Sequence, residues 1–304
     1  MKKYLPLSII TILLFFTSCK EQPVPYSNNV CKSNSPFVAK LGFDPNRSYF
    51  STSDARRMGL VLVQAADIRN PTAGAARVYQ DSTWKMGGWL APIQIDDLGN
   101  IYVAPVPFIN VMHNDATKQN TIFQVNAQSG KMQQFLSLPT RANNNNENPF
   151  GIIGFAYLCE TNTLYVSSVA GSTRKEELGV IYAVDVRSQK IIDSLPGVDA
   201  LGLGIAYVAD KRQLFLGHAR SAQVFSIDLN REGKFLGKPT IAFSLDGLGV
   251  RGDDKVRRIK TDTDGSLIVY GMEFNFNLIA PHEKQETVYH FVFDATELKW
   301  IRKL

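Results

Sequence analysis

One phrase recurs five times along this chain: an apolar run, a tight polar turn, a second apolar run, then further short apolar runs. The turns read Asp44-Pro45-Asn46-Arg47, Asp96-Asp97-Leu98-Gly99-Asn100, Glu160-Thr161-Asn162, Ala209-Asp210-Lys211-Arg212 and Asp262-Thr263-Asp264-Gly265. Self-similarity at a period of roughly fifty residues, built from short strands alone, is the signature of a β-propeller. The repeat therefore predicts the architecture before any single motif suggests a chemistry.

Each copy fits a four-stranded antiparallel blade, whose first strand lines the central channel and whose fourth lies at the rim. Apolar–polar alternation and enrichment in aromatic and β-branched residues favour strands over helices. Copies two to five give strands at 91–95, 101–104, 121–125, 131–136; 152–158, 164–167, 180–184, 190–193; 204–208, 214–217, 223–227, 240–244; 256–260, 267–270, 288–293 and 299–302. The degenerate first copy gives 39–43, 49–52, 60–63 and 77–79. We predict an all-β fold, a β-propeller of five four-stranded antiparallel blades; six blades is the alternative, with a sixth concealed in 64–88 or 228–254.

The N-terminus has the features of a targeting segment. Lys2 and Lys3 precede an apolar stretch from Leu5 to Phe16, which is short for a membrane span. Small residues then lead into Cys19, and this order resembles the lipobox of bacterial lipoproteins, in which the cysteine becomes the lipidated first residue. We expect residues 1–18 to be a signal peptide, 19–36 a lipidated cysteine and flexible tether, and 37–304 a single propeller domain. An ordinary secretory peptide is the alternative.

Lipidation at Cys19 predicts a protein of the cell envelope, held at the outer membrane by its lipid anchor. The short charged stretch Lys20-Glu21 resembles the export signals of surface lipoproteins, so exposure at the cell surface is one reading and a solvated tether the other. The formal net charge is +5, and about +3 without Lys2 and Lys3. This balance is too mild to indicate a nucleic-acid partner.

Two cysteines remain after Cys19, and an exported compartment permits a disulfide between them. Cys31 lies in the tether and Cys159 at the turn of the third copy, so a bridge would fasten the tether to the domain. Two unpaired thiols are the alternative. Neither a Cys/His spacing typical of zinc nor another metal or cofactor motif is present, and we expect none.

The longest insertions fall mainly between the second and third strands of a blade, and these loops share one face of a propeller. Long loops on a rigid scaffold mark its working face. Arginines, histidines and a tryptophan at a channel mouth suit an anionic or sugar-like ligand. The candidate ligand-binding residues on this face are Arg57, Trp89, His113, Arg174, His218, Arg220, Arg257 and Glu273.

Phrases such as Asn100-Ile101-Tyr102-Val103-Ala104 and Thr163-Leu164-Tyr165-Val166-Ser167 resemble the senescence-marker/gluconolactonase propellers over about residues 85–275. The resemblance implies a divalent metal, held by Glu, Asn and Asp, that polarises a lactone carbonyl. The matching positions here carry Phe150 and Arg257, and no Glu occurs between Gln22 and Asn146. The metal site of that family is therefore not expected.

Two functional hypotheses follow. The first is a membrane-tethered, non-catalytic propeller that binds a glycan, a peptide or an envelope protein through its loop-rich face, with no catalytic residue. The second is a lactonase-like propeller hydrolase with a non-standard site around His113, His218 and Glu273.

Overall fold

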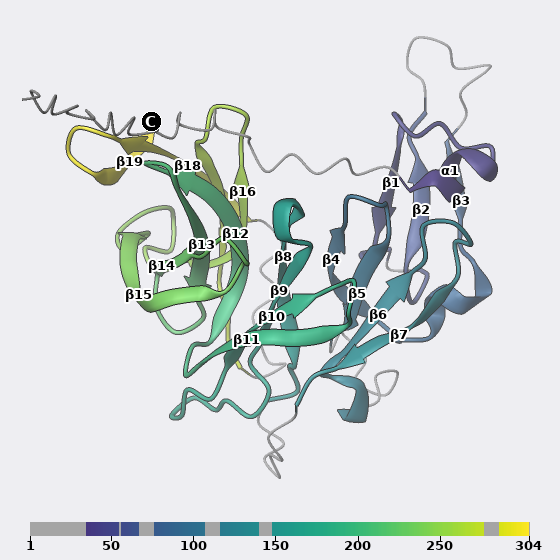
Figure 1. Cartoon of the computed structure of the whole chain (residues 1–304), viewed down its shortest axis with the longest axis horizontal. Helices are drawn as coiled ribbons and strands as arrows, with labels where there is room; N and C mark the ends of the chain where they lie inside the picture. Colours follow the sequence, from purple (N-terminus) through teal and green to yellow (C-terminus); the bar gives the residue numbers. More distant parts are fainter. Residues whose placement is uncertain are drawn as a thin grey trace, which may run out of the picture.

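The computed structural model describes residues 35–54, 56–66, 76–106, 116–139, 148–276 and 286–303. Their regular structure is one short helix, three 3₁₀ turns and strands β1 to β19. The strands form five antiparallel sheets around a centre, with β4, β8, β12 and β16 toward the middle and β7, β11 and β15 toward the rim (Figure 1). The all-β fold and the five-bladed propeller predicted from the repeat are confirmed.

Sheets two to five each have four strands in chain order. They are β4 (Leu90–Ile95), β5 (Ile101–Pro105), β6 (Thr121–Val125) and β7 (Met132–Ser137); β8 (Ile152–Leu158), β9 (Thr163–Ser168), β10 (Val180–Asp185) and β11 (Lys190–Pro196); β12 (Ala200–Val208), β13 (Lys211–His218), β14 (Gln223–Leu229) and β15 (Phe235–Ser244); β16 (Lys255–Thr261), β17 (Leu267–Met272), β18 (Thr287–Asp294) and β19 (Lys299–Lys303). The 3₁₀ turns are η1 (Ser82–Lys85), η3 (Ala116–Lys118) and η4 (Cys159–Thr161).

The first sheet differs from the other four. It contains β1 (Ser48–Ser51), β2 (Val61–Gln64) and β3 (Arg77–Tyr79), in that order. The strand predicted at 39–43 is wrong, because helix α1 (Pro36–Lys40) and the turn after it occupy this segment. Pro36 favours the first turn of a helix, where its missing N–H costs nothing, and Phe37 and Val38 then point into the core.

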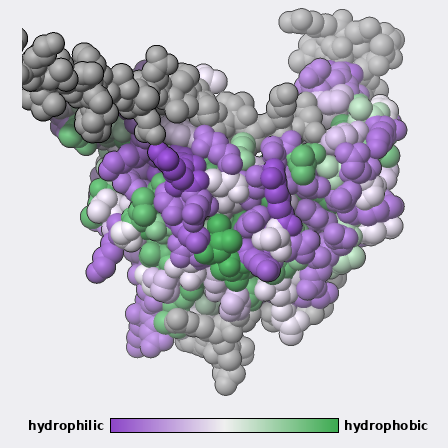
Figure 2. All heavy atoms as spheres, viewed as in Figure 1, coloured by the Kyte–Doolittle hydropathy of each residue, from purple (hydrophilic) through white to green (hydrophobic). Residues whose placement is uncertain are grey.

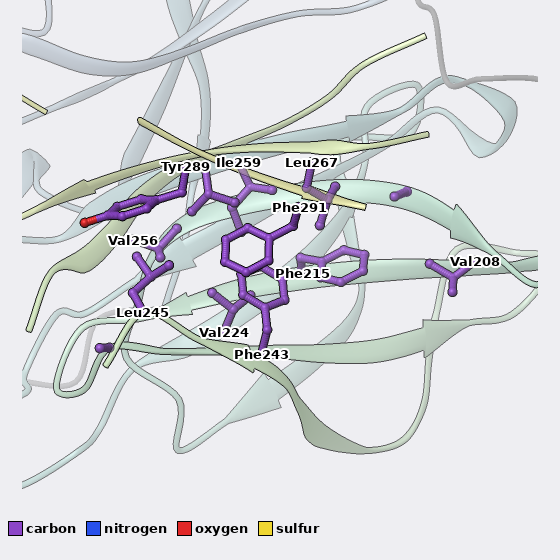
Figure 3. Close-up of a cluster of buried hydrophobic side chains, with 13 residues drawn as sticks. Val208, Phe215, Val224, Phe243, Leu245, Val256, Ile259, Leu267, Tyr289 and Phe291 are labelled. Atoms are coloured by element: carbon purple, nitrogen blue, oxygen red, sulfur yellow. The ribbon is translucent and has the colours of Figure 1, made fainter. Parts of the chain in front are cut away.

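Hydrophobic clusters join each sheet to the next. Trp84 is fully buried between the first and second sheets, where its ring lies edge-on to Phe37, Phe50 and Tyr79. Between the fourth and fifth sheets, Phe243 stacks on Phe291 with ring centroids 4.1 Å apart (Figure 3). Two further clusters link the second sheet to the third and the third to the fourth.

Within the described residues, the last and first sheets are not linked by a hydrophobic cluster of this kind. Among the described residues, none of these clusters connects β16–β19 to β1–β3. Strands β5 and β9 are buried at every position, as expected for sheets covered on both faces, whereas β17 alternates between buried and half-buried residues. The face of the fifth sheet that lies away from the fourth is therefore less covered than its counterparts.

The visible surface in Figure 2 is mostly hydrophilic, with apolar side chains gathered near its middle. Within the part of the chain that the structure describes, no helix has the length and apolar character needed to cross a bilayer.

Candidate functional site

The loop-rich end of the channel is where the innermost strands begin and the second strands end. An apolar cluster lies at this end. It consists of Val169, Leu201, Ala219 and Phe276, with Phe150, Ile153 and Phe274 packed against it. These residues precede, open or follow β8, β9, β12, β13 and β17, so the strand starts and ends of three blades bring them together. We refer to these seven residues as the plug.

Two rings of this plug remain half-buried. The centroids of Phe150 and Phe274 lie 5.4 Å apart, and Phe274 meets Phe276 edge-on at 5.2 Å. Half-buried aromatic rings at the end of a channel offer flat apolar contact to a sugar ring or an apolar side chain. Phe274 and Phe276 alternate with Glu273 and Asn275 directly after a strand, and this alternation is visible in the sequence. The predicted site residues were mainly charged ones, so they did not include these two rings.

Arg220, one of the predicted ligand residues, forms several hydrogen bonds. Its Nε donates to Asp199 Oδ2 at 2.7 Å, and its terminal nitrogens donate to the carbonyls of Thr173, Arg174 and Glu176. Its guanidinium carbon also lies 4.7 Å from the centroid of the Phe276 ring. The side chain therefore holds the loop between β9 and β10 against the fourth blade.

Asp199 is fully buried beside this arginine. It also accepts hydrogen bonds from the Ser172 hydroxyl at 2.5 Å and from the Gly179 amide at 2.9 Å. Burial raises the pKa of the Asp199 carboxyl above its ordinary value, although the bonds from Ser172 and Arg220 act in the opposite direction. A buried carboxylate with these donors is a structural centre for the two blades.

His218 lies next to Arg220 and Asp199 and connects Ser221 with Glu177. Its Nδ1 is 2.8 Å from Ser221 Oγ, and its Nε2 is 3.0 Å from Glu177 Oε1. Glu177 Oε1 also accepts the Asp199 amide, and Ser221 Oγ accepts the Gln223 amide at 3.3 Å. The structure thus brings His218, Arg220 and the Arg174 backbone together, through Glu177 and Asp199, which the sequence prediction did not include.

The other predicted residues lie in separate places. Arg57 is exposed and pairs with Asp54 at 3.0 Å, and Arg257 is exposed and lies 3.5 Å from Glu286. The backbone of Arg257 packs against Gly202, one residue from Leu201 of the plug. Trp89 and Glu273 are half-buried. His113, Cys19 and Cys31 lie outside the described residues.

Cys159 is disulfide-bonded. Its pairing with Cys31 stays a prediction, because that residue is not described. Among the residues that the structure describes, no three His, Cys, Asp or Glu side chains lie close enough together to hold a metal ion.

A cavity of about 990 Å³ occupies the opposite end of the channel. Its walls come from the second halves of β4, β8 and β16, the middle of β12 and most of β1, including Ile95, Tyr157, Ile205, Lys260 and Tyr49. None of the predicted ligand residues that the structure describes lines this space. No local pattern in the sequence predicts this cavity, because strands of all five blades form its walls.

No protein-family model matches the sequence. No curated protein is detectably similar to it. Several solved structures are similar to it over most of the chain. A luciferin-regenerating enzyme is 8% identical, with a TM-score of 0.46 over 84% of this chain and 72% of the enzyme. The soluble aldose sugar dehydrogenase of Escherichia coli is 15% identical, with a TM-score of 0.44 over 79% of this chain and 78% of the dehydrogenase. A glucose dehydrogenase is 12% identical, with a TM-score of 0.43 over 79% and 76%. The chain's own five sheets around one centre define the class as β-propeller, a fold that serves enzymes and binding proteins alike.

Proposed function

We propose that this protein is a membrane-tethered, non-catalytic β-propeller that binds a glycan or a peptide of an envelope partner through its loop-rich face. The observation that carries the proposal is the half-buried pair Phe150 and Phe274 at the channel end. Rigid aromatic side chains supply large contact area at a low entropic cost, and such residues dominate binding energy in many interfaces. The exposed Arg257, whose backbone lies against Gly202, pairs with Glu286 at 3.5 Å, and this ion pair adds polar groups for recognition.

The neighbouring polar residues support a fixed platform rather than a reactive centre. Arg220 and Asp199 satisfy one another and three backbone carbonyls, so their polar atoms are already engaged. A site whose supporting side chains are locked by hydrogen bonds presents its contact residues in one geometry, which favours affinity.

The ligand class can be tested with the soluble protein carrying Cys19→Ala, applied to a glycan array and to a displayed peptide library. We expect binders in one of the two panels and at least tenfold weaker binding by the double variant Phe150→Ala/Phe274→Ala. Leu236→Ala, which removes an exposed side chain on the outermost strand β15, is the matched control and should bind normally. Unchanged binding by the double variant would remove the loop-rich face from the proposal.

The tether is proposed from Cys19 and its lipobox-like setting. In membrane fractionation, the Cys19→Ala protein should move from the membrane pellet to the soluble fraction, since several acyl chains are needed for lasting attachment. Continued membrane association of this variant would contradict lipidation at this residue.

A hydrolase is the second candidate, favoured by one arrangement. Ser221, His218 and Glu177 form a hydrogen-bonded row in the order hydroxyl, imidazole and carboxylate. This order can activate a serine toward an acyl or lactone carbon. Turnover of a lactone or ester that is abolished by Ser221→Ala would establish this activity, and the absence of turnover would leave the row a structural contact.

A further inference from the structure

The cavity at the end of the channel opposite the loop-rich face has mixed walls. Most of its lining is aliphatic or aromatic, including Ile95, Phe155, Leu203 and Ile205. Its volume of about 990 Å³ is ample for a small molecule, and sites for small molecules are mostly apolar with a few polar groups. Those polar groups decide what such a site binds, and here they include residues of β1 and residues at the end of β16.

Two opposite charges line the cavity at the end of β16. Lys260 belongs to this strand, and Asp262 directly follows it. The Asp262 amide donates to the Ser266 carbonyl at 2.9 Å, which continues the pairing of β16 with β17. Because alternate residues of an extended strand project from the same side, Lys260 and Asp262 share one side of the strand, with their backbones about 6.6 Å apart.

Neither charge is neutralised within the described part of the chain. Lys260 Nζ lies 5.5 Å from the centroid of the Tyr270 ring, and Asp262 Oδ1 accepts the Thr263 amide at 2.7 Å. Both side chains are exposed, and among the described residues no ion pair engages either of them. A ligand with one negative and one positive group satisfies both charges, whereas a ligand of a single sign is attracted by one and repelled by the other.

Strand β1 adds neutral hydrogen-bonding groups to the same cavity. Ser48, Tyr49 and Phe50 line it, and β2 is the one described strand that pairs with β1. The Ser48 hydroxyl is buried and has no hydrogen-bond partner among the described groups, which is uncommon for a buried polar atom. The second edge of β1 carries N–H and C=O groups of the kind that pair with an extended backbone.

We propose that this cavity binds a short peptide with free termini and aliphatic side chains. The carboxylate of the peptide pairs with Lys260 and its ammonium group with Asp262, while its side chains contact the isoleucines of the walls. Its backbone supplies donors and acceptors to β1 and to the Ser48 hydroxyl. A sugar fits this place less well, because aliphatic walls leave its hydroxyl groups without hydrogen-bond partners.

The separation of the two charges sets the length of the peptide. An extended chain rises about 3.3 Å per residue, so two or three residues place the termini at a distance close to that between Lys260 and Asp262. This site lies at the other end of the channel from Phe150 and Phe274. It is therefore independent of the proposed ligand face, and a failure at one end does not decide the result at the other.

Calorimetric titration of the soluble protein carrying Cys19→Ala with dileucine and trileucine tests the proposal. We expect saturable binding of at least one of them. The same peptide with an acetylated N-terminus and an amidated C-terminus should bind at least tenfold more weakly, and so should the serine peptide of equal length. The absence of saturable binding, or equal binding of the free and the capped peptide, would overturn the proposal.

Two variants that each remove one charge assign the termini. Lys260→Gln should bind the free peptide at least tenfold more weakly and should no longer distinguish a carboxylate from an amide at the C-terminus. Asp262→Asn should lose the corresponding distinction at the N-terminus. The matched control Lys238→Gln removes an exposed lysine of the outermost strand β15 and should bind as the wild type does. Variants that keep both distinctions would contradict the roles given to Lys260 and Asp262.

Photo-crosslinking locates the peptide without any further substitution. Trileucine with a diazirine group on its central side chain should label the segments that line the cavity, at 93–95, 203–205 or 259–263. Labelling of residues 273–276 at the loop-rich end instead would overturn the placement of this site.

Discussion

Arg220 Nη2 lies 2.7 Å from the buried carboxylate of Asp199, and the same guanidinium donates to backbone carbonyls of the preceding blade. One side chain thereby fastens the β9–β10 loop of the third blade to the fourth. Replacing Arg220 with Ala leaves a buried carboxylate with fewer donors, so we expect the free energy of unfolding to fall by about 3 kcal/mol. Chemical denaturation measures this loss. The matched control is the exposed Arg187→Ala, for which we expect a change within about 0.5 kcal/mol.

A double variant measures the interaction between Arg220 and Asp199 directly. In the double variant Arg220→Ala/Asp199→Asn the buried charge is absent, so the double variant should be more stable than Arg220→Ala alone. A double variant whose loss equals the sum of the two single losses would contradict an interaction between these residues.

Asp81 connects the first blade to the second and gives a pH-dependent prediction. It accepts from Lys131 Nζ at 2.6 Å and from the Thr83 amide and hydroxyl. Burial would raise its pKa, but these donors outweigh burial and lower the pKa of Asp81 to about 2. A lowered pKa stabilises the fold above the unfolded-state pKa near 4, and this contribution is lost as the pH falls toward 2.

We therefore expect Asp81→Asn to lower the free energy of unfolding at pH 7 by on the order of 1–2 kcal/mol, with allowance for the exposed Lys131 partner. The difference between the variant and the wild type should shrink between pH 4 and pH 2. Urea denaturation at pH 7, 4 and 2.5 measures both effects. A difference that stays constant over this range would show that Asp81 does not contribute through its charge.

The disulfide of Cys159 gives a third prediction. If its partner is Cys31, peptide mapping without reductant should yield one linked peptide pair that contains both residues. Because the bridge closes a loop of well over 100 residues, Cys31→Ser and Cys159→Ser should each lower the free energy of unfolding by about 2–5 kcal/mol, and the two losses should be equal. A linked pair that contains Cys19 would contradict this pairing.

The repeat predicted most of the fold correctly. Strands β6 and β8 have the predicted bounds, because tight turns and apolar alternation are local signals. The first blade was the exception: its predicted strand at 39–43 begins just inside a short helix opened by Pro36. Apolar residues such as Phe37 and Val38 suit either element, and only their contacts with Trp84 and the second blade decide between them.

The sequence predicted where the candidate site lies, but it did not predict which residues contact one another there. Arg220 and His218 were selected because the repeat places them at a loop-rich end. Their partners Asp199 and Glu177 stand 21 and 41 residues away in sequence, and no local pattern reports such pairs. Phe150 and Phe274 of the plug stand 124 positions apart in sequence, and their rings meet only when the blades close around the channel.

We expect the loop-rich face to bind its ligand without converting it. The most direct measurement is incubation of the soluble protein with each ligand that the glycan and peptide panels yield, together with a set of lactones and esters. Binding is measured by calorimetry, and the recovered compound is identified by mass spectrometry. We predict saturable binding, loss of at least tenfold in affinity for Phe150→Ala/Phe274→Ala, and recovery of every compound unchanged. Conversion of any compound by the wild type that Ser221→Ala abolishes would contradict the account.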